Sequence, residues 1–294
     1  MTKQNIPIFL MNCLSLVSRL CLSLIFLLVA QPGARGAAIM VNEYKNTGGS
    51  ADGTKMVTDE YIEFVLTQNL TAAELAGFVF GDSNTATSSL VSAFQFDLTT
   101  LTGILTTAGR GDFLAGTIIV VKGTALGPED LSYNPNAGNI ADDAAWSIQL
   151  VAGLGAKDHP STSINGNLDI AGTGDVIWVA SSLPSSTTDT SSFIHALGHD
   201  TSPGAIGTAV TSQFGAASLL GSNITSSQSV YNTAGALVSL TNSTSGTMGT
   251  VNTPDNSTWI QNQLRLTAVG VPEPSRAILV LVALAAMTTR RTRE

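Results

Sequence analysis

The feature that most constrains the fold is a succession of short apolar runs, rich in β-branched and aromatic residues, separated by clusters of Gly, Asn, Asp and Ser. Runs of this length and composition, interrupted in this way, are typical of strands and turns. The sequence therefore predicts an all-β protein. We expect strands at 39–45, 60–66, 78–80, 90–98, 117–122, 146–151, 175–180 and 192–197.

The order of residues within the runs predicts which faces are buried. In the run EYIEFVL, Ile62, Phe64 and Leu66 share one face, and Glu63 lies on the other face beside Tyr61. Because successive side chains of a strand point to opposite sides, this pattern predicts one buried face and one wet face. The runs TIIVVKG and DVIWVA are nearly all apolar and are expected to be central strands.

Helical periodicity is scarce, with two exceptions. In TPDNSTWIQNQL, Thr253 can cap a helix and Pro254 suits its first position, ahead of an apolar stripe that includes Trp259. Thr71 and Glu74 have the spacing of a capping box, which predicts a single helical turn after Thr71.

The first 36 residues have the layout of a secretory signal peptide. Lys3 and Arg19 precede an apolar stretch at 21–30, and the small residues of GARGAA follow it. A charged start, an apolar core and a small-residue site occur in this order in signal peptides. We therefore expect residues 1–36 to form a signal helix that is removed on export. A buried N-terminal helix is the alternative.

The end of the chain, 271–294, has three parts: a proline-rich motif, an apolar run at 277–287 and a basic cluster. The apolar run has 11 residues, whereas a helix that spans a bilayer needs about 20, so it predicts only a short membrane helix. Basic residues beside such a helix stay on the cytoplasmic side. The motif and the cluster consist of Val271, Pro272, Glu273, Pro274, Arg290, Arg291 and Arg293.

In these three parts the tail resembles the PEP-CTERM sorting signal of bacteria, although Arg276 stands between the motif and a short apolar run. The resemblance implies an exosortase-type processing enzyme as partner and transient anchoring at the inner membrane. It also implies removal of the tail and release to the cell surface or extracellular matrix. An ordinary C-terminal anchor is the alternative.

The charge of the region between these ends excludes several classes of function. From Ala37 to Gly270 there are six Lys or Arg and 19 Asp or Glu residues, a net charge of −13. Such a surface repels phosphate backbones, so we expect no nucleic-acid partner. The two cysteines, Cys13 and Cys21, lie within the predicted signal peptide. The region after it therefore has no disulfide, thiolate metal site or cysteine nucleophile.

A second resemblance covers 39–180. Its motifs are Asn42-Glu43, Glu60 to Phe64, Leu75 to Asp82, Gly116 and Gly174-Asp175. In their order they resemble the lamin-tail domain, although Phe64 stands where a Leu is usual. The resemblance implies an immunoglobulin-like β-sandwich over 37–180 that binds or scaffolds without catalysis. The Ser/Thr-rich region 181–270 is expected to be an extension partly packed on this sandwich. A mobile, glycosylated stalk is the alternative.

Two groups of residues are candidates for metal binding. His195 and His199 are four residues apart, but Gly198 opposes a helix there and no glutamate supplies a base, so the sequence favours a strand end over a zinc site. Calcium binds clustered oxygen ligands. The sequence suggests no cofactor other than calcium. The calcium candidates are Asn134, Asn136, Asp142 and Asp143, near Asn139.

The function expected from the sequence is that of an exported surface or matrix protein with a structural or adhesive role, and not of an enzyme. Its partners would be exopolysaccharide or other surface proteins. The alternative is a secreted, glycosidase-like hydrolase. For that chemistry, Glu43 and Glu63 on adjacent strands could supply the pair of carboxylates that glycoside cleavage needs.

Overall fold

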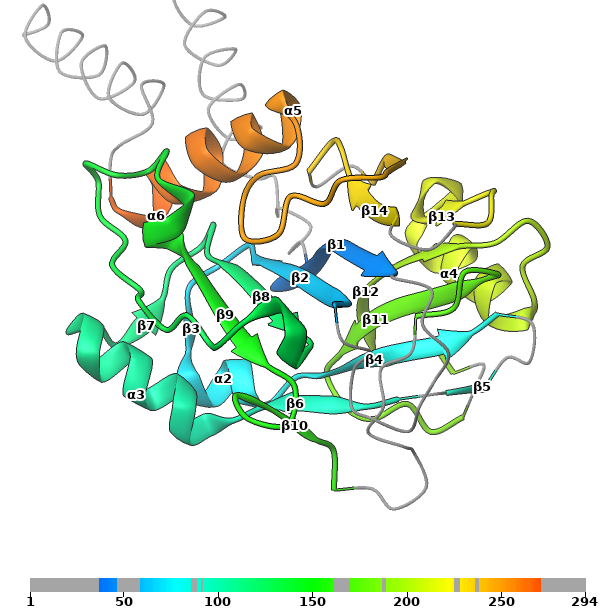
Figure 1. Cartoon of the computed structure of the whole chain (residues 1–294), viewed down its shortest axis with the longest axis horizontal. Helices are drawn as coiled ribbons and strands as arrows, with labels where there is room; N and C mark the ends of the chain where they lie inside the picture. Colours follow the sequence, from blue (N-terminus) through cyan, green and yellow to red (C-terminus); the bar gives the residue numbers. More distant parts are fainter. Residues whose placement is uncertain are drawn as a thin grey trace, which may run out of the picture. The chain divides into compact units, whose positions relative to one another are not determined.

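Two β-sheets packed face to face form the centre of the fold (Figure 1). The computed structural model describes residues 37–46, 59–85, 89–90, 92–160, 170–186, 189–224, 228–235 and 238–270. The predicted signal peptide and the predicted sorting tail, 271–294, lie outside the described residues. None of the helices within the described ranges is long and apolar enough to cross a bilayer.

The first sheet is antiparallel except at one edge, where β8 and β9 run parallel. Its strands in spatial order are β15 (Leu240–Ser243), β14 (Gln228–Asn232), β1 (Ile39–Asn46), β2 (Tyr61–Leu66), β8 (Ile118–Lys122) and β9 (Ser147–Val151). The second sheet is antiparallel except between its last two strands. It consists of β10 (Ala156–Asp158), β6 (Phe94–Phe96), β4 (Val79–Asn84), β11 (Asp175–Ala180), β12 (Phe193–His199) and β13 (Leu219–Leu220), with β5 (Ser89–Leu90) beside β4.

The predicted β-rich class is confirmed, and most strand ranges agree closely with the structure. The range 90–98 is wrong: β6 covers only Phe94–Phe96, and Leu98 already begins the helix α3 (Leu98–Ala108). Asp97 caps this helix, since its side chain accepts a hydrogen bond from the amide of Thr100. A second helix that the sequence did not predict is α4 (Ala205–Phe214).

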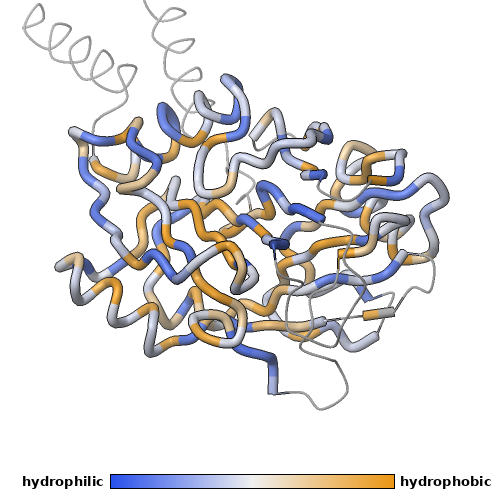
Figure 2. Tube along the Cα trace, in the orientation of Figure 1, coloured by the Kyte–Doolittle hydropathy of each residue, from blue (hydrophilic) through white to orange (hydrophobic). Residues whose placement is uncertain are grey.

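The apolar core lies between the two sheets. Figure 2 shows apolar residues concentrated along the strands of the interior. Four phenylalanines meet there: Phe64 of the first sheet contacts Phe80, with 5.1 Å between ring centroids, and Phe80 lies 4.7 Å from Phe96 and 5.7 Å from Phe94. Burying each such side chain stabilises the fold by about 1.5–3 kcal/mol, so this cluster holds the sheets together.

The outer faces of both sheets are also covered. The helix α4 packs Ile206 and Val210 on the second sheet around Trp178. On the first sheet, Trp259 and Ile260 cover an apolar patch that includes Val65. They belong to the C-terminal helical segment, which consists of α5 (Pro254–Ser257), a π-helix at Thr258–Arg265 and α6 (Leu266–Ala268).

This covering corrects the prediction of a wet face on β2. All of Tyr61–Leu66 is buried, because the C-terminal segment lies across the face that carries Glu63. The two predicted helix starts are confirmed. Thr71 and Glu74 form the capping box of α2 (Ala72–Ala76), and the side chain of Thr253 caps α5.

The Ser/Thr-rich region supplies strands to both sheets. β12 pairs with β11 of the second sheet, and β14 pairs with β1 of the first. The remaining short elements are β3 (Leu70–Thr71), paired with β7 (Asp112–Phe113), and 3₁₀ turns at Thr124–Leu126, Asp143–Trp146 and Ala216–Ser218.

Candidate functional site: a buried carboxylate pair

Glu43 and Glu63 lie directly opposite one another on neighbouring strands of the first sheet. They are register partners of β1 and β2, and a β-bulge between Val41 and Glu43 turns the Glu43 side chain to the outer face. The sequence placed both glutamates on adjacent strands, and the structure confirms it. Both residues are 0 % exposed.

A loop segment, Gly246–Asn252, covers the two carboxylates; we call it the strap. Glu43 accepts a hydrogen bond from the Thr247 amide at 3.0 Å, and its Oε2 shares a further hydrogen bond with the hydroxyl of the same residue. Glu63 accepts one from the Gly249 amide at 2.7 Å. The strap approaches closely because Gly246 has no side chain: a Cβ there would lie 1.9 Å from the hydroxyl oxygen of Tyr61. Gly249 adopts φ of +77°, a conformation that favours glycine.

Neighbouring side chains complete the polar cluster. The Tyr61 hydroxyl donates to Glu43 Oε1 at 2.5 Å, and Asn42 Nδ2 donates to Glu63 Oε1 at 2.7 Å. Burial raises the pKa of both carboxyls, and the charge of Glu43 raises the pKa of Glu63 further. Burial and the nearby Glu43 also raise the pKa of Tyr61. Two carboxyl groups this close and this buried do not both ionise readily.

The arrangement does not suit glycoside cleavage as it stands. That reaction needs one carboxylic acid and one carboxylate on either side of a bound sugar, with room for the sugar between them. Here the strap covers both carboxyl groups, and its amides already bind their oxygens. The geometry therefore fits a structural role better than a catalytic one.

A buried arginine lies at the other end of the same covered face. Arg265, at the end of the π-helix, donates from Nε to the Gly116 carbonyl at 3.0 Å and from Nη1 to the Ile140 carbonyl at 2.8 Å. Its Nη1 also pairs with Asp143 Oδ1 at 2.7 Å. The guanidinium lies over the Trp146 ring, 5.1 Å from its centroid. Sequence reasoning missed this residue, because its partners come from distant segments.

The calcium candidates take different places in this structure. Asp143 is engaged by Arg265, by Gln261 Nε2 and by the Val251 amide. Asn136 is exposed, and its side chain accepts from the Gly138 amide within its own turn. Asn134 and Asp142 are exposed on the same loop. Among the described residues no group of three or more metal-ligating side chains comes together, and calcium binding at the four candidates stays a prediction.

His195 and His199 both lie on β12, and His199 is its last residue, in agreement with the prediction of a strand end. His195 Nδ1 accepts from the Val41 amide at 3.2 Å. His199 Nδ1 lies 2.8 Å from the Tyr44 hydroxyl, and its Nε2 lies 2.8 Å from the Ala171 carbonyl. Burial lowers the pKa of His195 to about 3 and that of His199 to about 4. Both rings are therefore neutral parts of the interior at neutral pH.

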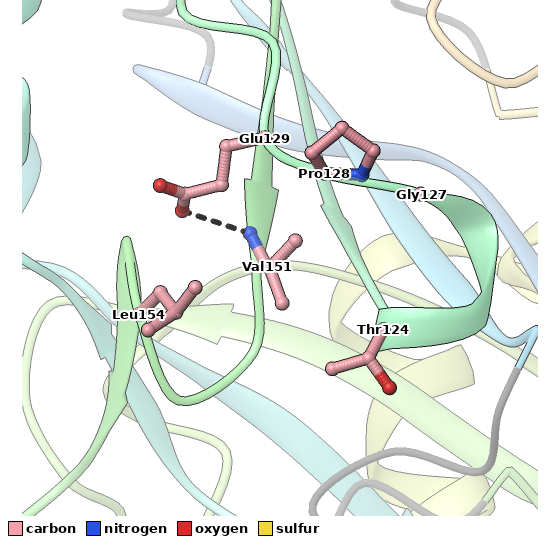
Figure 3. A pocket seen from close by; sticks show the side chains of 6 residues that line it. All are labelled: Thr124, Gly127, Pro128, Glu129, Val151 and Leu154. Atoms are coloured by element: carbon pink, nitrogen blue, oxygen red, sulfur yellow. Dashed lines mark hydrogen bonds between the residues drawn. The ribbon is translucent and has the colours of Figure 1, made fainter.

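A hollow of about 590 Å³ lies beside β9 (Figure 3), and neither Glu43 nor Glu63 is among the residues that line it. It is lined by Thr124, Gly127, Pro128, Glu129, Val151 and Leu154. The Glu129 carboxylate does not project freely into it, since Oε1 accepts from the amides of Val151 and Gly155. The hollow has one acidic group that is already bonded, which gives it little means to select a ligand.

Comparisons with protein-family models, curated proteins and solved structures find no match to this chain. The resemblances to the PEP-CTERM signal and to the lamin-tail domain therefore stay predictions from the sequence. The residues of the proposed sorting signal lie outside the described residues.

Proposed function

We propose that the chain is an exported bacterial surface or extracellular-matrix protein whose tail is processed by an exosortase-type enzyme, and whose sandwich is of the lamin-tail type. Its role is structural or adhesive. The observation that carries the proposal is the pairing of a signal-like start with a three-part tail around a strongly acidic region that has no cysteine. Such a region is suited to the outside of a cell, where charge keeps it soluble.

The positions of the lamin-tail motifs support the fold part of this proposal. Asn42-Glu43 lies on β1, Glu60 to Phe64 leads into β2, and Gly174-Asp175 leads into β11. Asn42 and Glu63, which the resemblance places in neighbouring strands, are joined by a hydrogen bond. Asn42 and Glu63 thus bond within the protein, as structural parts of the motif would.

The exposed surface of the described residues offers no aromatic side chain on which a sugar ring could stack. All aromatic side chains among the described residues are buried or half-buried. Stacking platforms therefore do not contribute, and contacts to polysaccharide or protein would use polar and acidic loops. The alternative hydrolase finds its strongest support in the opposed Glu43 and Glu63, but the strap covers both.

Intact mass spectrometry of the protein recovered from the culture medium and the matrix tests the proposal. We expect a mass that lacks 1–36 and some or all of 271–294. Recovery outside the cell with Arg290 to Glu294 still present would refute exosortase processing. Turnover of a polysaccharide that is lost in a folded Glu43→Gln variant would refute the non-catalytic role.

A further inference from the structure

The hydrogen-bond network around the carboxylate pair fixes the position of a proton. The direction of each bond can be worked out from backbone groups, because an amide N–H only donates and a carbonyl only accepts. The Asn252 amide donates to Asn256 Oδ1 at 3.1 Å, which fixes the orientation of that side-chain amide. Asn256 Nδ2 then donates to Asn42 Oδ1 at 2.9 Å.

This chain of bonds ends on Glu63. With Asn42 Oδ1 accepting from Asn256, Asn42 Nδ2 must face Glu63 Oε1, and it does so at 2.7 Å. The other oxygen of Glu63 faces the Gly249 amide, also at 2.7 Å. Both hydrogen-bond partners of Glu63 are therefore N–H donors. Glu63 acts purely as an acceptor, which is the behaviour of an ionised carboxylate.

The bonds around Glu43 have the opposite consequence. Asn252 Nδ2 faces two backbone carbonyls, those of Asn42 and Asn232, each at 3.2 Å. Asn252 Oδ1 therefore faces the Thr247 hydroxyl, 2.5 Å away, and must accept its hydrogen. A threonine hydroxyl has a single hydrogen. The close contact between Glu43 Oε2 and the same hydroxyl oxygen is favourable only if Glu43 supplies the proton.

We propose that Glu43 is a protonated carboxyl that donates to Thr247, that Glu63 is its ionised partner, and that this one-proton pair is a pH-sensitive clasp on the strap. Glu43 Oε1 accepts from Tyr61 and from the Thr247 amide, and Oε2 carries the proton. The inference does not depend on the proposed function. Burial raises the pKa of both carboxyls, and that of Glu63 more strongly, so these shifts support a retained proton but do not place it. The directions of the hydrogen bonds place it on Glu43.

Charged groups on the surrounding elements do not neutralise the pair. Lys45 of β1 lies near Asp59, and Lys122 of β8 donates to Gln149. Arg265 of the π-helix is paired with Asp143, whose charge raises the pKa of Glu63. Tyr61 of β2 bonds Glu43, and Tyr231 of β14 is the register partner of Glu43 on its other side. The strap itself, GTMGTVN, has no titratable residue.

The clasp has a defined pH dependence. The folded state holds a proton that a glutamate in the unfolded chain, with its pKa near 4.5, has lost. The stabilisation is therefore complete below about pH 4.5 and is lost as the pH rises through the raised pKa of the folded state. When the proton leaves, two carboxylates face one another, and Glu43 meets a lone pair of the Thr247 oxygen. The strap is then held less tightly.

Two isosteric variants of the full chain separate this assignment from the reverse one, in which Glu63 holds the proton. In Glu43→Gln, the amide NH₂ replaces the carboxyl proton, so the bonds to the Thr247 hydroxyl and from Tyr61 are kept, as is the shorter bond from the Thr247 amide. We expect its thermal midpoint to match that of the wild type near pH 5 and to exceed it increasingly towards pH 9. In Glu63→Gln, an NH₂ group must face an N–H donor, so we expect a midpoint lower by roughly 3–10 °C across the range.

Because the comparison uses the difference from wild type at each pH, the titration of the histidines cancels. A Glu43→Gln variant that loses as much stability as Glu63→Gln, or a Glu63→Gln variant that loses none, would overturn the assignment. A measurement on the wild type does not depend on variants that fold. The infrared carbonyl band of a protonated carboxyl should be present at neutral pH and disappear at alkaline pH, and its absence at neutral pH would also overturn the proposal.

Discussion

Replacing Arg265 by methionine should destabilise the domain by about 3–5 kcal/mol, the usual cost of breaking a buried ion pair. Arg265 is 0 % exposed, and its guanidinium donates to the Gly116 and Ile140 carbonyls and to Asp143. Methionine keeps most of the side-chain volume and the contact with Trp146, so the loss is mainly polar. Each buried acceptor that is left without a partner costs about 1–3 kcal/mol.

The remaining hydrogen bonds of Asp143 decide where in the range of about 3–5 kcal/mol the loss of stability falls. Its side chain is 13 % exposed and keeps its bonds to Gln261 and Val251 when the arginine is gone. The carboxylate is therefore not stranded, and the two carbonyls account for most of the loss. We expect a value near the lower end. Urea denaturation followed by tryptophan fluorescence measures it, because Trp146 lies against the altered side chain.

Arg110→Met is the matched control. Arg110 is half-buried and bonds the Pro135 carbonyl, so its loss should cost less than about 1 kcal/mol. The reasoning fails if the two variants lose the same free energy of unfolding. A double-mutant cycle gives a second test. If Asp143→Asn costs as much free energy of unfolding in the Arg265→Met background as it does in the wild type, the two residues are not coupled and the reasoning fails.

Two further predictions concern acid stability and capping. Because burial lowers the pKa of His195 to about 3, stability is complete above the unfolded value of 6.5 and is lost as the pH falls towards the folded value. His195→Asn can still accept from the Val41 amide without titrating, so the acid-unfolding midpoint, measured by circular dichroism, should move to lower pH; an unchanged midpoint contradicts this. Thr71→Ala should lower the free energy of unfolding by about 1 kcal/mol in urea denaturation, since it removes the capping box of α2. A loss below about 0.3 kcal/mol contradicts that expectation.

The sequence predicted the strands well where periodicity and composition agree. β1, β2, β8, β9 and β11 begin and end within one or two residues of the expected ranges. These strands are long apolar runs bounded by turn residues, so local pattern and tertiary packing favour the same structure. The capping residues Thr71 and Thr253 were predictable for the same reason, because a cap is a local interaction.

The helix α3 shows why part of the fold could not be predicted. Its sequence, LTTLTGILTTA, is rich in threonine and contains a glycine, both of which disfavour helices in isolation. Leu101, Ile104 and Leu105 nevertheless form one buried stripe at helical spacing, and Asp97 and Gly109 cap its ends. The predicted strand ended at Leu98, the first residue of this helix, and the weak propensity left the rest of the stripe without a prediction. Tertiary burial outweighs the weak propensity here.

The buried carboxylate pair shows what a local sequence pattern could not predict. An acidic residue at alternate positions of a strand normally indicates a solvated face, and Glu63 fitted that pattern. What reverses it is a strap that arrives nearly two hundred residues later, with amide donors spaced to meet the two carboxyls. A buried acid needs such donors, and glycine-rich backbone supplies them where no side chain would fit. Gly246 and Gly249 are visible in the sequence, but nothing in the sequence shows that they lie over Glu43 and Glu63.

The strap and Arg265 together explain how an acidic sandwich keeps its C-terminal segment in place. The segment covers an apolar patch on the first sheet, and a cover of so few residues would be weakly held by burial alone. Hydrogen bonds hold the segment at both of its ends. Glu43 and Glu63 bind the strap, which precedes α5. At the other end, Arg265 of the π-helix is bonded to Gly116, Ile140 and Asp143. Because these bonds form in only one register, they fix where the segment lies as well as whether it binds. The described domain is therefore tied down up to Arg265, a few residues before the proposed sorting tail begins at Val271.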